Sequence, residues 1–416
     1  MASTFVSILR YKDFKNIWLA QITSQIALNM LNFALVLHIY QMTGSTTSIS
    51  LVLIASAIPS VIFGPFSGVF ADRFNYKKIL TITNFLRFLA VLLLFLGKNN
   101  LLAILEIVFL ISTFTQFFAP AELSSIPLII PKKKLVGANS IIMTTMYGSL
   151  LIGYSLAGPL ISLMTLNGLF LTCCLLYLIS TIAIARMTNY DTKEIKKISL
   201  TTLAKDFESI WHETRQGIKK VRVTQKIWQP MLKMAIGWMI LGAFVVLLPA
   251  FSESNLGIST NLVGLVVIAP AGIGMLIGAL ILDRKKLFDF MRAINKAFFL
   301  VGVALLLFSL YRLYGEFVLS RLISTLLVVA VGIGSSIIYI SAQTALQMNS
   351  EEKWRGRVFG INSMMVNIAM SVPALLVGGI ADLTSPFIAM LLIAFGVFVY
   401  GASLFMETTA AEGSKA

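Results

Sequence analysis

The stretch GVFADRFNYKK, from Gly68 to Lys78, lies between two long apolar segments and decides how the rest of the chain is interpreted. Apolar residues from Ile49 to Phe70 lead into it, and those from Ile79 to Leu96 lead out of it. A short charged segment between two apolar runs of about 20 residues is typical of a tight turn between membrane helices. The stretch therefore predicts a turn at the cytoplasmic face of a membrane.

The composition is that of a membrane protein. Of the 416 residues, 57% are hydrophobic and 12% are charged, and the mean hydropathy is +0.88. A soluble domain usually has about 25% charged residues. Only helices or closed barrels span lipid, and continuous apolar runs exclude a barrel. We therefore expect an all-α membrane protein.

Twelve apolar segments are long enough to cross a bilayer as helices. They are Trp18–Tyr40, Ile49–Phe70, Ile79–Leu96, Leu101–Ile130, Ile141–Met164, Leu169–Ala185, Met231–Phe251, Val263–Leu282, Ala297–Leu313, Phe317–Ala345, Val358–Ile380 and Phe387–Phe405. This pattern predicts a six-helix half over residues 1–188, a linker over 189–228, a second six-helix half over 229–406 and a tail over 407–416. Apolar residues at near-helical spacing, with lysines between them, predict an amphipathic helix within the linker.

Positive charge gathers in every second loop. The basic residues there are Arg10, Lys12, Lys15, Arg73, Lys77, Lys78, Lys132, Lys133, Lys134, Arg284, Lys285, Lys286, Lys353, Arg355 and Arg357. Because basic residues mark cytoplasmic loops, both termini are expected in the cytoplasm of a multi-pass plasma-membrane protein. The net charge of +15 is thus a topology signal, with attraction to anionic lipid heads as a second role. We do not expect a nucleic-acid partner.

The Gly68–Lys78 pattern resembles the loop between helices 2 and 3 of major facilitator superfamily transporters. That family also has two six-helix halves, which are parallel repeats joined by one long loop. Asp283-Arg284-Lys285-Lys286 after the eighth span is a weaker copy of the motif. Asn75 stands where the family usually has glycine, and asparagine tolerates the left-handed backbone conformation that such a turn uses.

The resemblance implies a conformational latch. Asp72 would end the second span, where the helix dipole disfavours an anion, so it needs a partner. The implied partner is the amino end of the eleventh span near Arg357 and Val358, with Gly68 allowing close approach. Arg73, Lys77 and Lys78 would orient the loop and bind lipid phosphate.

Two further stretches resemble the macrolide-efflux and siderophore-exporter branch of this superfamily. One is FFAPAE at Phe117–Glu122 with PLIIP at Pro127–Pro131, and the other is WRGRVFG at Trp354–Gly360 leading to GGIAD at Gly378–Asp382. The resemblance implies a secondary transporter that exports a small molecule. Drug antiporters of the family often carry an arginine in the fourth span, and Leu110–Gln116 has none. Proton coupling of that type therefore stays open.

The fifth span carries Gly148, Gly153, Gly158 and Pro159. This series is similar to the glycine-proline motif in the fifth span of the antiporter branches. It favours export. The alternative is that the glycines only let helices pack closely.

Uncharged polar residues follow one face of the first span. Gln21, Gln25, Asn29 and Asn32 share that face, and Ser336, Tyr339, Gln343 and Gln347 repeat the pattern in the tenth span. Such stripes avoid lipid, so they line a watery cavity or bond helices together. The substrate-cavity candidates are Gln25, Asn29, Asn32, Tyr339 and Gln343.

Four charged residues lie inside spans. Arg87 and Glu122 are at similar depth in neighbouring spans, which predicts a buried pair. Glu106 and Arg321 are at matching depth in repeat-related spans. Glu106 would either be solvated at the outer face without a role, or face the cavity and exchange a proton, with Arg321 as its partner in one conformation.

The sequence favours transport over the alternatives. It has no Gly-x-x-x-x-Gly-Lys-Ser/Thr loop, no disulfide framework, no metal-ligand spacing around Cys173 and Cys174, and only two histidines, so we expect no enzyme, cofactor or metal. The predicted function is export of amphipathic small molecules by a monomer, with protons as a candidate coupling ion. The alternatives are lipid, lysolipid or siderophore transport, nutrient import and a non-transporting membrane scaffold.

Overall fold

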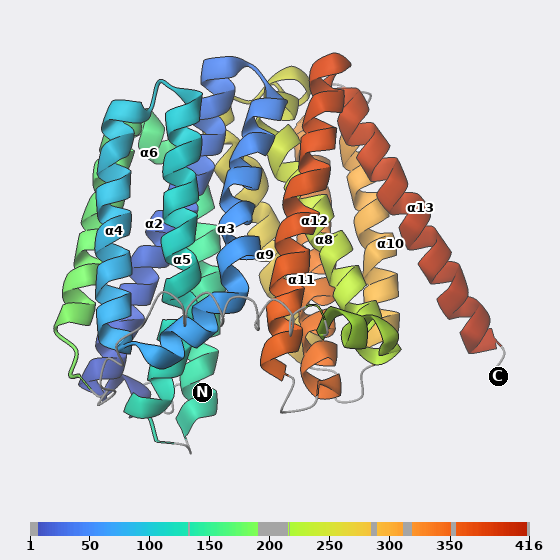
Figure 1. The fold of residues 1–416 in the computed structure, drawn as a ribbon. Helices are drawn as coiled ribbons and strands as arrows, with labels where there is room; N and C mark the ends of the chain where they lie inside the picture. Colours follow the sequence, from blue (N-terminus) through green and yellow to red (C-terminus); the bar gives the residue numbers. More distant parts are fainter. Residues whose placement is uncertain are drawn as a thin grey trace. The chain divides into compact units, whose positions relative to one another are not determined.

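The computed structural model describes residues 7–131, 134–189, 215, 217–283, 289–310, 318–350 and 355–413, and these are almost entirely helical. Much of the middle segment lies outside the described residues, including most of the predicted amphipathic helix. From that segment the structure describes residues 187–189, residue 215 and a helical turn over 217–223 that precedes α8. The predicted all-α fold is confirmed (Figure 1).

The helices follow the predicted spans closely. In the first half they are α2 (Lys12–Thr43), α3 (Thr46–Arg73), α4 (Tyr76–Gly97), α5 (Leu101–Ile129) and α6 (Leu135–Ala185). In the second half they are α8 (Gln225–Phe251), η2 (Ser252–Leu256), η3 (Thr260–Leu262), η4 (Gly264–Ile268), α9 (Ala269–Asp283), α10 (Phe290–Ser309), α11 (Val318–Asn349), α12 (Arg355–Leu383) and α13 (Pro386–Gly413).

Within the described residues, 11 helices are long and apolar enough to cross a membrane. One of them contains a sharp break at Thr165, whose φ of 63° lies in the left-handed region. This break falls between the predicted spans Ile141–Met164 and Leu169–Ala185, so α6 supplies two of the twelve expected spans.

Asparagine or aspartate residues start three of the helices. Asn75 caps α4, Asn100 caps α5 and Asp289 caps α10, each accepting a hydrogen bond from a backbone N–H in the first turn. Side-chain oxygens at this position satisfy amide groups that a helix leaves free at its amino end.

The chain divides into two compact units. Unit 1 comprises Met1–His38 and Ile54–Thr214, and unit 2 comprises Ile39–Leu53 and Arg215–Ala416. The end of α2 and the start of α3 therefore group with the second half of the chain. The sequence did not predict this exchange.

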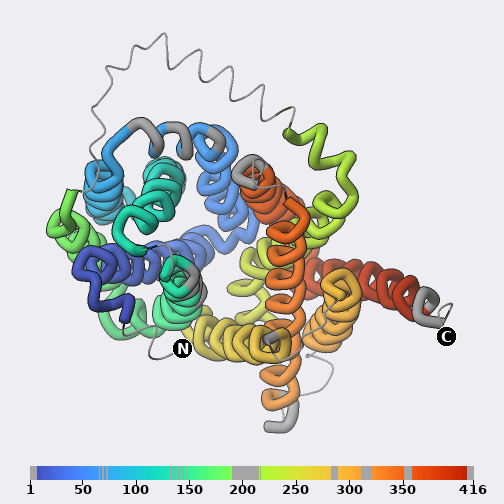
Figure 2. The backbone as a smooth tube through the Cα atoms, turned by 90° about the horizontal axis from the view of Figure 1, so that it is seen from below, coloured from blue at the N-terminus to red at the C-terminus, as the bar shows by residue number. Residues whose placement is uncertain are grey.

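Each unit has its own packing. In unit 1, α4 contacts α5 and α6, and Figure 2 shows α4 and α5 next to each other, nearly end-on. In unit 2, α10 packs on α11 and α13, while α8 packs on α11 and α12.

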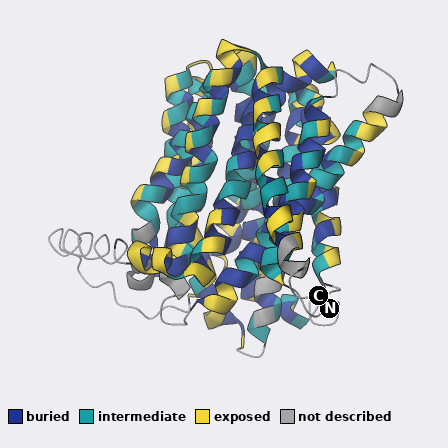
Figure 3. Ribbon diagram, turned by 90° about the vertical axis from the view of Figure 1, so that its right-hand side faces the viewer, coloured by how far each residue is buried: buried dark blue, intermediate teal, exposed yellow. Residues whose placement is uncertain are grey.

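Many large apolar side chains remain exposed along the helices, such as Ile82, Leu102 and Leu376 (Figure 3). Apolar helix faces left outside the core suit contact with lipid.

Candidate transport site

Five polar side chains form a buried cluster in the middle of unit 1. Asn84 and Arg87 come from α4, Glu122 from α5, and Tyr177 and Ser180 from α6. Their exposed fractions are 0%, 2%, 5%, 0% and 0%. Arg87 is among the largest side chains that the unit buries. Burying charge in a membrane protein is costly, so such residues are usually functional.

A chain of hydrogen bonds links part of this cluster. Asn84 Nδ2 donates to Ser180 Oγ at 2.7 Å, and Ser180 Oγ donates to the carbonyl oxygen of Ala20 in α2 at 2.9 Å. Arg87 Nη1 donates to Asn84 Oδ1 at 3.1 Å. The cluster therefore ties α2, α4 and α6 together through Asn84.

Arg87 and Glu122 are both buried, but the structure has no direct hydrogen bond or ion pair between them. Arg87 Nη2 donates to the carbonyl oxygen of Phe114 at 3.4 Å, and its guanidinium carbon lies 4.6 Å from the centre of the Phe118 ring. Glu122 follows Phe118 by one helical turn on the same face of α5. The two charges are thus neighbours in one buried site and interact electrostatically, but the guanidinium uses other acceptors.

Three buried polar atoms of the cluster have no hydrogen-bond partner among the described residues. They are Arg87 Nε, Glu122 Oε1 and Tyr177 Oη. Buried polar groups are normally paired, so these three unpaired atoms single out the cluster as a candidate functional site. Asn84, Tyr177 and Ser180 were missed by the sequence analysis. The spacing of Asn84 and Arg87 by three residues was a usable signal, because it puts both on one helix face.

The structure separates Glu106 from this buried site. Glu106 lies in α5 with an exposed side chain, and Arg321 lies in α11, also exposed. The burial that a coupling role for Glu106 requires is not found. Of the carboxylates proposed for coupling, Glu122 alone is buried.

The polar face of α2 divides into two kinds of residue. Gln21 is 2% exposed and donates from Nε2 to the carbonyl oxygen of Ile142 in α6 at 3.1 Å, which is an interhelical bond. Gln25, Asn29 and Asn32 are half-buried. These three remain candidates for the substrate cavity.

The glycines of α6 differ in their surroundings. A Cβ atom at Gly153 would lie 2.7 Å from Asn29 Cβ and 2.8 Å from the backbone nitrogen of Met30, so this glycine lets α6 approach α2. A Cβ at Gly148 would meet nothing within 4 Å. Gly158 is buried and Pro159 is half-buried. Close packing is therefore the role of Gly153 in this structure.

Unit 2 holds an aromatic and amide group on α8, α11 and α12. The rings of Trp238 and Tyr339 are 6.0 Å apart and meet edge to face. Among the described residues, Trp238 Nε1, Gln343 Oε1 and Asn362 Oδ1 have no hydrogen-bond partner. Asn362 is 5% exposed, and its Nδ2 faces Met234 Sδ at 3.8 Å. Tyr339, predicted for the cavity, thus packs against Trp238, which was not predicted, and Gln343 follows Tyr339 by one turn of α11.

The Gly68–Lys78 loop is built differently from expectation. Asn75 has φ −66° and ψ 117°, which is extended and not left-handed. Its Oδ1 accepts from the backbone of Lys78 at 3.0 Å, and its Nδ2 donates to Asn189 Oδ1 at 2.6 Å. Asparagine serves here as a helix cap, a role that needs extended backbone. The glycine-like conformation was therefore a wrong prediction.

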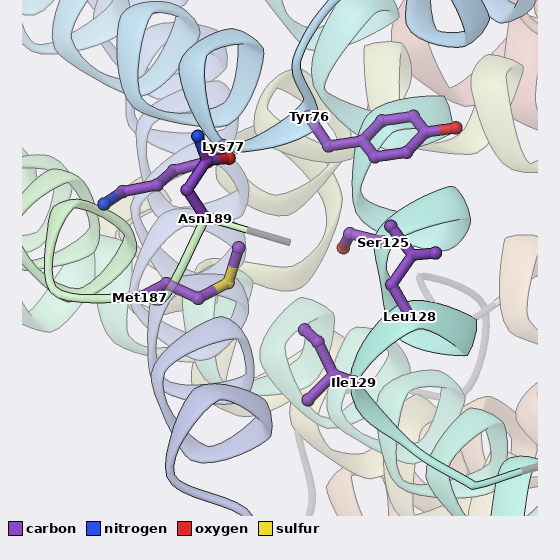
Figure 4. Close-up of a pocket in the computed structure, with 7 residues that line it drawn as sticks. All are labelled: Tyr76, Lys77, Ser125, Leu128, Ile129, Met187 and Asn189. Atoms are coloured by element: carbon purple, nitrogen blue, oxygen red, sulfur yellow. The ribbon is translucent and has the colours of Figure 1, made fainter. Parts of the chain in front are cut away.

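The latch residues are only partly described. Lys77 is half-buried and Lys78 is exposed, whereas the side chains of Gly68, Asp72 and Arg73 lie outside the described part. A cavity of about 10 Å³ lies under the start of α4, enough for one water (Figure 4). Its lining residues are Tyr76, Lys77, Ser125, Leu128, Ile129, Met187 and Asn189.

Metal sites and reactive thiols would draw on the His, Cys, Asp and Glu side chains of the described residues. They contain no group of three or more His, Cys, Asp or Glu side chains suited to a metal ion. Cys173 and Cys174 are free thiols buried in α6.

Comparisons with protein families, sequences and solved structures all match this chain to transporters. The profile of the Major Facilitator Superfamily matches residues 17–374. Macrolide efflux protein A of Streptococcus pyogenes is 24% identical over 380 residues, covering 89% of each chain. Lysophospholipid transporter LplT of Photorhabdus laumondii subsp. laumondii is 23% identical over 377 residues, covering 89% of this chain and 88% of its own. The crystal structure of nucleoside transporter NupG superimposes with a TM-score of 0.72 at 14% identity, over 95% of this chain and 99% of that one.

Proposed function

Because this chain belongs to the Major Facilitator Superfamily and is a multi-pass membrane transporter of a small molecule, we propose that it exports amphipathic compounds in exchange for protons. The single observation that carries the coupling is the buried Glu122 with its unpaired Oε1 beside the Arg87 guanidinium. Export is supported by the similarity to macrolide efflux proteins, since the proteins of that name match most of both chains.

The coupling works through a change of partner at Arg87. With a proton on Glu122, the carboxyl is neutral and Arg87 keeps its bonds to Asn84 and the Phe114 carbonyl. When the proton leaves, an unpaired carboxylate at this depth is strongly destabilised and attracts the guanidinium one turn along α5. That movement breaks the bond from Arg87 to the Phe114 carbonyl, which joins α4 to α5, and the bond from Arg87 to Asn84 within α4. Proton release is thereby linked to helix movement in unit 1.

Uncharged side chains are the groups proposed to bind the substrate. Trp238 and Tyr339 offer ring faces, and the free oxygens of Gln343 and Asn362 accept hydrogen bonds. Half-buried amides Gln25, Asn29 and Asn32 supply similar groups in unit 1. Apolar surfaces with a few polar groups bind drug-like molecules. An amphipathic substrate such as a macrolide matches this lining.

Lysophospholipid transport is the second candidate. It is supported by the similarity to a lysophospholipid transporter over most of both chains. A lysolipid also combines a polar head with an apolar chain, so the same lining suits it. The two candidates differ in how the substrate enters, because a lysolipid comes from the bilayer and a macrolide from water.

We also propose a membrane location, an orientation and an oligomeric state for the protein. The basic loops support a plasma-membrane protein with both termini in the cytoplasm, surrounded by anionic lipid heads. The two six-helix halves are expected to act together in a monomer, since each transporter of this family carries its whole pathway in one chain. Chemical labelling of single cysteines from either side of the membrane tests the orientation.

Transport in proteoliposomes tests the function. We expect a proton gradient to drive uptake of a radiolabelled macrolide into inverted vesicles, and Glu122→Gln to abolish this uptake while counterflow exchange continues. Glu106→Gln is the matched control, because it makes the same change on an exposed carboxylate of the same helix. Gradient-independent flux of a labelled lysolipid, with no macrolide uptake, would overturn the export proposal in favour of the second candidate.

A further inference from the structure

The carboxyl end of α12 meets the amino end of α3 through one carboxylate. Asp382 Oδ1 accepts from the backbone nitrogen of Thr46 at 2.8 Å and from Thr46 Oγ1 at 2.7 Å. Its Oδ2 accepts from Ser45 Oγ at 2.6 Å and from the backbone nitrogen of Thr47 at 3.0 Å. Both oxygens are thus filled by the first turn of α3.

The contact continues along two turns of each helix through small residues. Thr46 Oγ1 lies 2.8 Å from the carbonyl oxygen of Gly378, and Ser50 Oγ donates to the carbonyl oxygen of Ala374 at 2.8 Å. A Cβ atom at Gly378 would lie 2.5 Å from Ser50 Oγ, so only glycine allows this approach. Thr46 and Ser50 are 1% and 0% exposed. This contact between α3 and α12, called the seam below, is held by hydrogen bonds and not by interlocking apolar side chains.

The position of Asp382 on its own helix is unfavourable. It is the penultimate residue of α12, where the helix dipole repels an anion, whereas the amino end of α3 attracts one. Docking on α3 is therefore what stabilises the charge. The α3 end has its own cap, because Ser45 Oγ also accepts from the backbone nitrogen of Ser48 at 3.2 Å. The start of α3 keeps this cap when Asp382 leaves, and the exposed Asp382 can return to water.

The seam lies where one helix belongs to both units. Residues 46–53 of α3 group with α12 in unit 2, and the rest of α3 continues in unit 1. Holding or releasing this short segment consequently changes how firmly the first turns of α3 are packed on α12. No other described helix is divided between the units except α2, at its carboxyl end.

We propose that Asp382 and the first turn of α3 form a releasable latch on the predicted outer side. This inference rests on the alternating-access transport of the proposed function, which needs one end closed while the other is open.

Distances between spin labels test the latch. After Cys173 and Cys174 are replaced by alanine, one pair of labels at the exposed Leu102 and Leu262 reports the predicted outer side. A second pair at the exposed Leu128 and Val223 reports the predicted inner side. We expect Asp382→Asn to shift the outer pair toward longer distances and the inner pair toward shorter ones.

Matched variants separate the latch from general charge effects. Glu253→Gln removes an exposed carboxylate after α8, on the same predicted side, and should leave both distributions unchanged. Thr46→Val keeps the shape of the side chain but removes the hydroxyl that serves Asp382 and Gly378, so a smaller shift in the same direction is expected even if Asp382→Asn folds poorly. If the outer label pair gives the same distance distribution in Asp382→Asn, in Thr46→Val and in the Glu253→Gln control, the latch is overturned.

The distance measurements test the latch whichever substrate the protein transports. Shifted distances without proton-driven macrolide uptake would retain the latch and reject the exporter. Proton-driven uptake with unshifted distances would retain the exporter and reject the latch.

Discussion

Replacing Gly153 by alanine tests whether the glycine series of α6 acts through close packing. The added Cβ would lie 2.7 Å from Asn29 Cβ and 2.8 Å from the Met30 backbone nitrogen. Both distances are shorter than carbon and nitrogen atoms tolerate, and one neighbour is backbone, so α2 and α6 must move apart. Overpacking of this kind costs about 1–3 kcal/mol.

Gly148→Ala is the control within the same helix. Its Cβ would meet nothing within 4 Å, and alanine favours a helix over glycine by about 1 kcal/mol. The helix preference is the same at both positions, so the difference between the two variants isolates the packing cost. At about 2–4 °C per kcal/mol for a unit of this size, the two melting temperatures should differ by about 2–12 °C.

Thermal unfolding of the purified variants, followed by size-exclusion chromatography, measures this difference. We expect Gly148→Ala to melt at or above the parent temperature and Gly153→Ala below it. Equal melting temperatures for the two variants would refute the packing argument. The glycine at 153 would then be explained by movement during transport, which the flux assay on the same variants would detect.

Three further variants test the sites described above. Asn84→Ala should lower the free energy of unfolding by about 1–3 kcal/mol, because it removes the acceptor of the buried Arg87 Nη1 and the donor to the buried Ser180 Oγ, and denaturation in detergent measures this. Asn75→Ala should lower stability by about 0.5–2 kcal/mol through loss of the α4 cap, whereas Asn75→Gly should cost only a few tenths in the cap itself; equal losses would reject the cap as the main role. Trp238→Ala should weaken macrolide binding about 2- to 10-fold, corresponding to about 0.5–1.5 kcal/mol for one aromatic contact, and unchanged affinity by calorimetry would remove Trp238 from the site.

Hydropathy and charge predicted the helices well because both depend on local sequence. The span predicted at Leu101–Ile130 is α5 at Leu101–Ile129, and that at Ile79–Leu96 is α4 at Tyr76–Gly97. A membrane requires such runs regardless of tertiary structure. The grouping of residues 39–53 with unit 2 depends on contacts with distant helices. No local pattern carries that information.

The charged site was predicted only in part for a similar reason. Arg87 and Glu122 stand out because charges are rare in apolar runs. Which acceptors the guanidinium uses depends on how α4, α5 and α6 are rotated about their axes, and a guanidinium has five donors to distribute. Tyr177 and Ser180 gave no signal, since hydroxyl residues are common in membrane helices. Treating Asn75 as a substitute for a turn glycine also gave a wrong backbone prediction, because its side chain accepts from the backbone N–H of Lys78 and caps α4.

The buried polar groups are divided between the two units by chemical type. Unit 1 buries an arginine and a glutamate together, both with unpaired atoms. The candidate lining in unit 2 is uncharged, and its buried Lys233 is bound to Asn295, which in turn donates to Thr408 Oγ1 at 2.9 Å. Lys233 is thus already paired, whereas Glu122 has an oxygen without a partner among the described residues. The arrangement therefore favours proton exchange in unit 1 and recognition of an uncharged ring system in unit 2.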